Sequence, residues 1–314
     1  MKKKKLVNLV FIMFFIGLFN RVIFLISSFK YQKIKKEHNF YSWKFGKIHY
    51  RVQGYGPPLL LIHGIGVGAS SYEWRKNVPY FSKYFRVYTI DLLGFGQSSK
   101  PKITYTAFLY VQLIHDFIRD VIKEPASVIA NSQGASFATM AASYSPSLFR
   151  KLVLISPTGI KKQESYPTLK TKLIKIMIEM PIIGTSFYQI ISSKPYIFYF
   201  MKRYLYKSFT LISSSLLNNY SGAAHLNGPS SRYPIASFMG GYMNVNVKNA
   251  LNQLTSDILI IWGKENELVP PSLLDEWLLI KPSISSYIFN KSKSMPHEEE
   301  TLHFNETCIS FLEN

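Results

Sequence analysis

The chain has 314 residues, of which 47% are hydrophobic and 18% charged, a composition that indicates a folded protein with a sizeable core and excludes a disordered chain. Its net charge of +19 would suit a nucleic-acid-binding protein, but nine positive charges and no acid lie before residue 37. The remaining excess follows no zinc-finger, RNA-recognition or helix-turn-helix pattern, so we expect no nucleic-acid partner. The single cysteine, Cys308, excludes a disulfide within the chain.

The first predicted element is an N-terminal hydrophobic helix. Residues 6–29 are largely apolar and follow lysines at positions 2–5. Such a segment is typical of a signal-anchor, and 24 residues can cross a hydrocarbon core of ~30 Å, although Asn20 and Arg21 interrupt it. We therefore expect residues 1–36 to anchor the protein in a membrane by a single span. Lysines on both sides leave its orientation open. The alternative is an apolar arm that packs on the domain or lies at the membrane interface.

Short apolar runs then alternate with helical patterns. Residues 43–52 read as a β-hairpin, 58–63 and 85–91 as buried strands, and 108–122 as a helix. A strand at 127–131, a helix at 134–144 and a strand at 151–156 follow. This alternation predicts an α/β fold with a mostly parallel sheet and helices on both faces.

The alternation stops near residue 160 and resumes near residue 257. The intervening residues are rich in lysine, aromatic side chains, methionine and serine, with helical patterns at 169–180 and 196–208. We interpret residues 160–250 as a helical lid inserted between two parts of one core, 37–159 and 251–314. The second part contains expected strands at 258–262 and 286–289 and helices at 272–280 and 302–312.

The most informative motif is Ala-Asn-Ser-Gln-Gly at 130–134, which joins a β-branched run to an alanine-rich helix. A serine in such a strand-to-helix turn adopts a strained backbone conformation that lifts its hydroxyl above the sheet edge. The residues two places to either side must be small, and here they are Ala130 and Gly134. The motif predicts a nucleophile elbow with Ser132 as the nucleophile.

Four landmarks in a fixed order surround this motif. They are His-Gly-Ile-Gly at 63–66, Asp-Leu-Leu-Gly-Phe-Gly-Gln-Ser at 91–98, the elbow itself, and Trp-Gly followed by Val-Pro between 262 and 270. Over residues 43–314 the chain resembles the α/β-hydrolase superfamily, in its esterase- and lipase-like branch with a helical lid. The resemblance implies a serine hydrolase whose oxyanion hole consists of the Ile65 and Gln133 amides. It also implies that His63 and Asp91 fix loops and take no part in chemistry. The sequence has no P-loop, Rossmann or paired-cysteine motif and no metal-ligand spacing of histidines, so we expect no cofactor and no metal ion.

The chain departs from this pattern at two positions. The segment after the seventh strand commonly carries an acid, and that position is Asn266. The closing segment commonly begins with the catalytic histidine, and an ungapped alignment from Pro296 to Phe304 places Ser294 there. The resemblance therefore implies that the acid and the base of the triad are both substituted.

These substitutions affect the expected chemistry directly. A serine hydroxyl is a poor nucleophile until a neighbouring imidazole accepts its proton, and Ser294 cannot do so near neutral pH. Loss of the base costs ~10⁶ in kcat and leaves the ~10³-fold effect of the oxyanion hole and binding. If the closing loop slips, His297 is the one nearby substitute base, with Glu265 or Glu267 as the residue that orients it. Alternatively His297 is a non-catalytic histidine of the motif.

Two functional hypotheses remain at this point. The first is a serine hydrolase acting on a lipophilic carboxylic ester or related acyl compound, with Ser132 as nucleophile and His297 as an improvised base. The second is a degenerate hydrolase, or pseudoenzyme, that binds a small lipophilic ligand or a protein partner at the membrane. Apolar stretches at 174–183, 197–206 and 238–243 are expected either to lie over Ser132 or to form the core of the lid.

Overall fold

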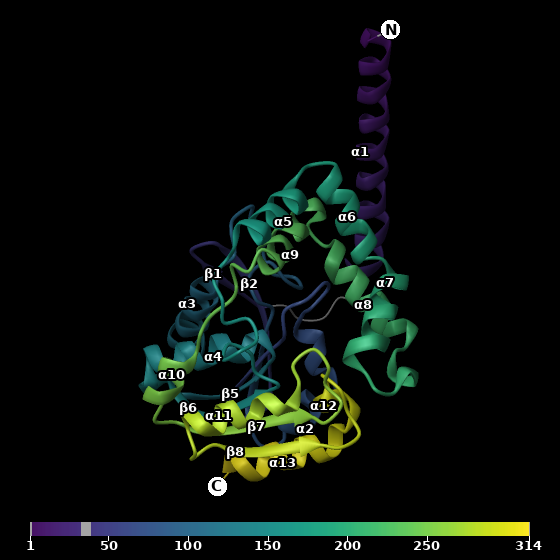
Figure 1. Cartoon of the computed structure of the whole chain (residues 1–314). Coiled ribbons are helices and arrows are strands. Elements are labelled where there is room, and N and C mark those ends of the chain that lie inside the picture. Colours follow the sequence, from purple (N-terminus) through teal and green to yellow (C-terminus); the bar gives the residue numbers. More distant parts are fainter. Residues whose placement is uncertain (1, 33–38, 314) are drawn as a thin grey trace.

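The computed structural model describes residues 2–32 and 39–313 and contains one eight-stranded sheet in the order β1-β2-β4-β3-β5-β6-β7-β8 (Figure 1). The strands are β1 (Asn39–Trp43), β2 (Gly46–Gln53), β3 (Pro58–Ile62), β4 (Arg86–Ile90), β5 (Ala126–Asn131), β6 (Phe149–Ile155), β7 (Asp257–Gly263) and β8 (Ser285–Phe289). The β1–β2 and β2–β4 pairs are antiparallel and the other five are parallel. This is the α/β-hydrolase fold, which confirms the predicted fold class.

The predicted hairpin is present, but its position in the sequence is shifted. The turn falls at residues 44–45, so that β1 lies at residues 39–43 and pairs with β2 from Asn39 opposite Tyr50 to Trp43 opposite Gly46. Gly46 has φ 141°. In that conformation a side chain is disfavoured, which explains why a glycine is the first residue of β2, directly after the turn.

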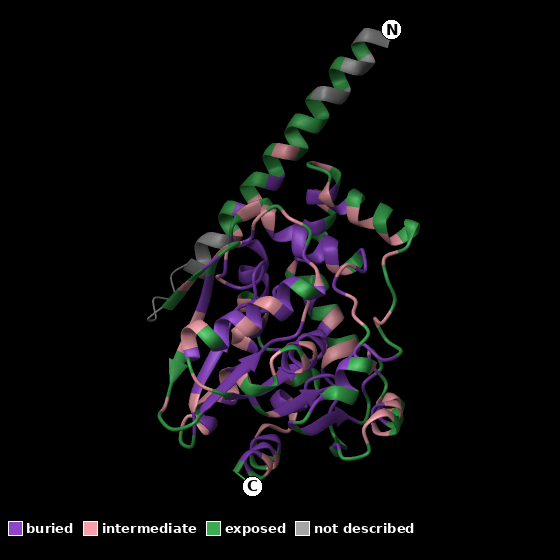
Figure 2. Cartoon of the chain, turned by 90° about the vertical axis from the view of Figure 1, so that its left-hand side faces the viewer, coloured by how far each residue is buried: buried purple, intermediate pink, exposed green. Residues whose placement is uncertain are grey.

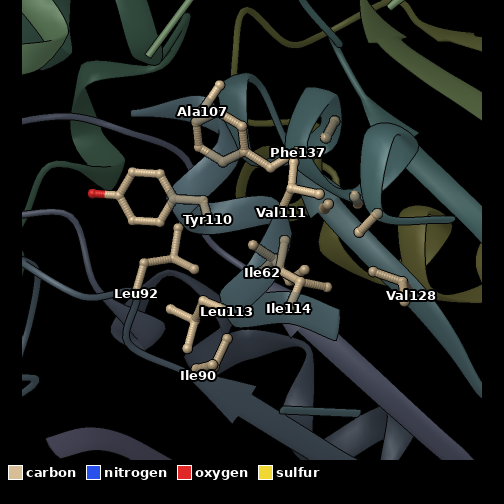
Figure 3. Close-up of a cluster of buried hydrophobic side chains, with 14 of the residues drawn as sticks. Ile62, Ile90, Leu92, Ala107, Tyr110, Val111, Leu113, Ile114, Val128 and Phe137 are labelled. Carbon is tan, nitrogen blue, oxygen red and sulfur yellow. The ribbon is translucent and has the colours of Figure 1, made fainter. Parts of the chain in front are cut away.

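Both faces of the sheet are covered, and the central strand β3 is apolar at every position. In β3, Leu60 and Ile62 pack into the cluster beneath α3 (Ala107–Phe117) and α4 (Gln133–Tyr144), part of which Figure 3 shows. Leu59 and Leu61 point the other way and pack with the cluster that includes α13 (Thr301–Glu313). A strand buried on both faces reads as a continuous apolar run because neither set of alternate side chains meets water.

The segment between β6 and β7 folds mainly as helices. The inserted helices are α5 (Leu169–Glu179), α6 (Ile183–Ile191), α7 (Lys194–Phe200), α8 (Ser214–His225) and α9 (Arg232–Met239); α10 (Lys248–Gln253) then packs beside α4. The other helices are α2 (Val78–Phe81), α11 (Leu274–Ile280) and α12 (Pro296–Glu299). Residues from the inserted segment contact the loops around the elbow. The Leu205 carbonyl accepts from the Ser294 amide, and the Met243 carbonyl accepts from Gln133 Nε2.

The N-terminal segment forms one helix, α1 (Lys2–Gln32), which projects from the body (Figure 1). Its second half packs on α6 and α8: Asn20 Nδ2 donates to Ser186 Oγ at 3.0 Å, and the buried Phe24 ring contacts Tyr188 and His225. The predicted boundary of this segment at residue 36 lies outside the described residues. Across residues 2–32 and 39–313, no individual helix has both the length and the apolar character to cross a bilayer; α5 and α6 meet the requirement only as a pair bent by 93°.

Candidate active site

The elbow has the geometry that exposes a nucleophile. Ser132 lies between β5 and α4 with φ 52° and ψ −120°, a conformation that is rare for a residue with a side chain. Its amide donates to the Ile155 carbonyl at 2.8 Å, which fixes the turn against β6. A Cβ at Gly134 would lie 2.7 Å from the His63 carbonyl. Glycine is needed here because the end of β3 passes so close to the helix start.

The loop after β3 lies beside this elbow and is held by a buried histidine. His63 Nε2 accepts from the Leu92 amide at 3.1 Å, so its Nδ1–H donates to the Gly64 carbonyl at 2.6 Å. A Cβ at Gly64 would lie 3.7 Å from the Ser132 Cβ. In the described part of the chain, the Ile65 amide donates to no other group. This amide is therefore available to a ligand.

The second predicted oxyanion donor is the first residue of α4. The Gln133 side chain is engaged elsewhere: its Nε2 donates to the Met243 carbonyl at 2.7 Å and its Oε1 accepts from Thr158 at 2.9 Å. Its amide belongs to the first turn of α4, where backbone N–H groups lack partners within the helix. The Gln133 amide thus directly follows Ser132 in the chain, and the loop at Gly64 lies beside Ser132.

Asp91 organises the neighbouring loop. Its carboxylate lies 2.8 Å from His49 Nδ1 and accepts from the Ser71 and Gln97 amides at 2.6 and 2.8 Å. Burial by itself would raise the pKa of this carboxyl, but the contact with His49 outweighs burial and, with the Gln97 amide, holds the pKa well below its usual range. Asp91 therefore joins β2, the loop after β4 and the turn at Ser71.

The family's acid and base positions lie in contact, but neither residue can perform its role. Ser294 Oγ lies 2.9 Å from Asn266 Oδ1 and 3.0 Å from the Tyr204 carbonyl. Asn266 Oδ1 also accepts from the Leu268 and Val269 amides, and its Nδ2 donates to Ser156 Oγ at 3.0 Å. These partners fix the orientation of the Asn266 amide. The Ser294 hydroxyl can therefore only donate, either to Asn266 Oδ1 or to the Tyr204 carbonyl. An imidazole–carboxylate pair is replaced by a hydroxyl–amide pair.

His297 is held in a buried cluster with Glu73. Its Nε2 lies 3.2 Å from Glu73 Oε1, and its ring packs on Trp74 with centroids 4.8 Å apart. Glu73 also accepts from Asn131 Nδ2 at 2.8 Å and from the Gly64 amide at 3.2 Å. Burial would raise the pKa of Glu73, but His297 and Asn131 together keep it below its usual value. The cluster ties the closing segment to the residues just before Ser132 and Ile65.

The slip that would bring His297 to Ser132 is opposed by its neighbours. The His297 carbonyl accepts from Asn77 Nδ2 at 2.9 Å, and the buried Glu298 carboxylate pairs in a bidentate manner with Arg75. Among the described residues, the Ser132 hydroxyl makes no hydrogen bond. The structure thus brings Ser294 together with Asn266, and His297 together with Glu73, but joins neither pair to Ser132.

The prediction that Glu265 or Glu267 orients His297 is wrong. Glu265 pairs with Lys207 and Glu267 with Arg203, each at 2.5 Å and at the surface. The partner is Glu73, which was missed because it lies 224 positions away in the sequence. The available indication was an acid directly before Trp74 in a segment otherwise suited to burial.

The sheet order and the strained serine between β5 and α4 are those of an α/β-hydrolase fold with a serine at its elbow. The family model for the alpha/beta hydrolase fold matches residues 57–178. The chain is 35% identical over 113 residues to a 2-hydroxy-6-oxo-6-(2'-aminophenyl)hexa-2,4-dienoic acid hydrolase of Metapseudomonas resinovorans. That match covers 35% of this chain and 39% of the relative, so the chain spans about two fifths of that relative's length.

Two solved structures share nearly the whole fold. A serine hydrolase involved in carbazole degradation superposes with a TM-score of 0.73 at 21% identity, over 88% of this chain and 98% of its own. A membrane phospholipase A, described as a bacterial virulence factor, superposes with a TM-score of 0.71 at 18% identity, over 99% of this chain and 98% of its own. At these identities the likeness establishes the fold.

Proposed function

We propose that this protein binds a lipophilic carboxylic ester or related acyl compound at a membrane, with the ligand's carbonyl at Ser132, and that turnover is limited to the rate an oxyanion hole supports without a base. One observation carries the proposal. The acid and base positions, Asn266 and Ser294, are in contact at 2.9 Å and hold no group that accepts a proton near neutral pH.

The expected chemistry follows from the proposed oxyanion-hole amides, which the chain keeps, and from the acid and base of the triad, which it replaces. The Ile65 and Gln133 amides can stabilise an oxyanion by about 3 kcal/mol per donor. Without an imidazole, Ser132 keeps its proton until hydroxide or the ligand removes it, and the loss of a triad base costs ~10⁶ in kcat. A carbonyl compound therefore binds and reacts slowly at this site.

The ligand class is supported by the surroundings of the site and by the relatives. The inserted segment is rich in aromatic side chains, methionine and isoleucine, and its backbone lies against the loops around Ser132. One similar structure is a membrane phospholipase A, and another is a serine hydrolase. These similarities support an acyl ligand and a place at the membrane for this chain.

A second candidate is an active hydrolase that uses His297 as its base. It is favoured by the buried His297–Glu73 pair, since a histidine beside a carboxylate is the arrangement that orients a general base. The pair reaches Asn131, next to the nucleophile. In this candidate, proton transfer would require the loop of His297 to move.

The proposal is tested by reacting the full chain with an alkyl fluorophosphonate and measuring the intact mass. We expect slow formation of one adduct, absent in Ser132→Ala. Because the Ser294 hydroxyl only donates a hydrogen bond, Ser294→Ala should react at the same rate within about twofold. Folded wild type without any adduct, or an adduct that persists in Ser132→Ala, would contradict the proposal.

A further inference from the structure

The inserted helices carry apolar side chains on their outside. On α5 the exposed large apolar side chains recur mostly every three to four residues and are between 56% and 76% exposed; they are Leu169, Leu173, Ile176 and Met177. This spacing places them on one helix face. Part of the stretch at 174–183 that was expected to cover Ser132 or to form a core is therefore at the surface. By contrast, Ile197, Met201 and Tyr206 lie in a buried cluster that also includes Met295 of the closing segment.

The apolar surface continues onto α6 and α1. After the 93° bend, α6 exposes Ile183, Phe187 and Ile190. The neighbouring α1 exposes a further set of large apolar side chains, among them Phe11, Phe14, Phe15, Leu18 and Phe19. A hollow of about 560 Å³ lies between α1 and Ile182, which directly precedes α6. Figure 1 shows α1, α5 and α6 at one end of the molecule, opposite the C-terminus, and Figure 2 shows that the described part of the projecting helix is mostly exposed.

The inserted segment as a whole carries mostly positive charges, and Lys170 and Lys172 on α5 are exposed. Residues 160–250 contain eleven lysines and arginines and two acids. Both acids are paired, Glu164 with Lys248 at 3.0 Å and Glu179 with Lys175 at 2.8 Å. An apolar face bordered by exposed lysines is the composition that binds an anionic lipid surface, where each nearby lysine adds electrostatic attraction.

The docking of α1 determines how far it can enter a bilayer. Asn20 and Phe24 are buried against α6 and α8, and Gln189 Nε2 donates to the Asn20 carbonyl at 3.2 Å. The part of α1 before Gly17, residues 2–16, extends about 22 Å at 1.5 Å per residue, short of the ~30 Å hydrocarbon core. Because lysines occupy positions 2–5, a docked α1 keeps these charges at the headgroups only if it lies obliquely in one leaflet.

We propose that the outer faces of α5 and α6, together with the projecting half of α1, form one surface that inserts into a single leaflet of an anionic bilayer. This inference rests on the proposed membrane location and specifies it. Asn20, which interrupts the apolar run in the sequence, serves in this arrangement as the polar contact that holds α1 against Ser186. The bilayer would then lie at the end of the molecule formed by the inserted helices.

The first test is binding of the full chain to vesicles of phosphatidylcholine with 30% phosphatidylglycerol, and of phosphatidylcholine alone, by co-sedimentation. Wild type should bind the anionic vesicles more tightly. Ile176→Ser with Met177→Ser should weaken this binding about tenfold or more, because both side chains leave water on docking. Leu279→Ser with Leu302→Ser is the matched control: these side chains are also exposed but lie on α11 and α13.

The second test distinguishes a single leaflet from a full span. Cys308 is buried and is the single native thiol, so Lys4→Cys places one reactive thiol on the exposed part of α1. On protein bound to preformed vesicles, a membrane-impermeant maleimide should label this position at a rate within about threefold of the unbound protein. Full protection that is relieved only when the vesicles are lysed would show a span and overturn the inference.

Each remaining outcome is decisive. Equal vesicle binding by the α5 variant and its control would overturn the role of α5 and α6. If the α5 variant changed the protein from dimer to monomer and left vesicle binding intact, a second copy of the chain would be the occupant of this surface. Absence of wild-type binding to either vesicle would overturn the inference and the membrane location, whereas the Ser132 adduct would still report separately on the proposed chemistry.

Discussion

Replacing Asn266 with aspartate and Ser294 with histidine in the same chain is expected to raise esterase activity by about 10²–10⁴-fold. A positioned general base contributes an effect of this size, and an aspartate is needed to hold the imidazole in the correct tautomer. Ser294 Oγ lies 2.9 Å from Asn266 Oδ1 in the wild type, so an aspartate and a histidine at these positions would be neighbours. The measurement is kcat/KM for p-nitrophenyl butyrate with full-length protein, before and after a further Ser132→Ala change.

The single variants provide the controls for this gain. Ser294→His alone should gain less, because the Asn266 amide favours the wrong tautomer, and Asn266→Asp alone should gain nothing. The imidazole must displace the contact between Ser294 and the Tyr204 carbonyl, which comes from the short helical turn η4 (Met201–Leu205) of the inserted segment. A folded double variant no more active than wild type would show that a missing base is not what limits turnover.

Asp91→Asn is expected to cost about 3 kcal/mol of unfolding free energy at pH 7, because it removes one partner of a buried, hydrogen-bonded pair. The pKa of Asp91 is lower in the folded protein than the ordinary value near 3.9. A lowered folded pKa gives stability that is present above the unfolded pKa and is lost as the pH falls through it toward the folded pKa. The variant should therefore lose less stability than wild type between pH 7 and pH 3.5.

Urea unfolding at several pH values measures this difference. Asp275→Asn is the matched control, since Asp275 is an exposed acid on α11, away from this network. Parallel stability curves for Asp91→Asn and wild type would contradict the role assigned to the Asp91 network. The same result would remove the reason for expecting the loops at Ser71 and Gln97 to be fixed.

Much of the fold could be predicted from the sequence because local and global preferences agree in the core. Residues 58–62 are apolar at every position, and β3 is buried on both faces. The small residues beside Ser132 are there because the backbone turns sharply and passes close to His63. The residues assigned to the acid and base positions, Asn266 and Ser294, do lie in contact, because each follows a neighbouring parallel strand, β7 and β8.

The rest depends on contacts between distant segments. The pattern around His297 suggested Glu265 or Glu267, whereas the fold supplies Glu73 from the loop after β3. The helical period of α5 predicts an apolar face but not whether that face meets the core or the outside. Asn20 looked like an interruption of a membrane span, because the sequence does not show that Ser186 lies beside it.

The most direct test of the central claim, that no imidazole accepts the Ser132 proton, is the pH dependence of fluorophosphonate reaction at this serine. For wild type we predict a rate that rises with hydroxide concentration from pH 5.5 to 9 without a plateau, and the same profile for His297→Gln. A sigmoidal rise with a midpoint at about pH 6.5, the ordinary pKa of histidine, that disappears in His297→Gln would show a working base and contradict the account.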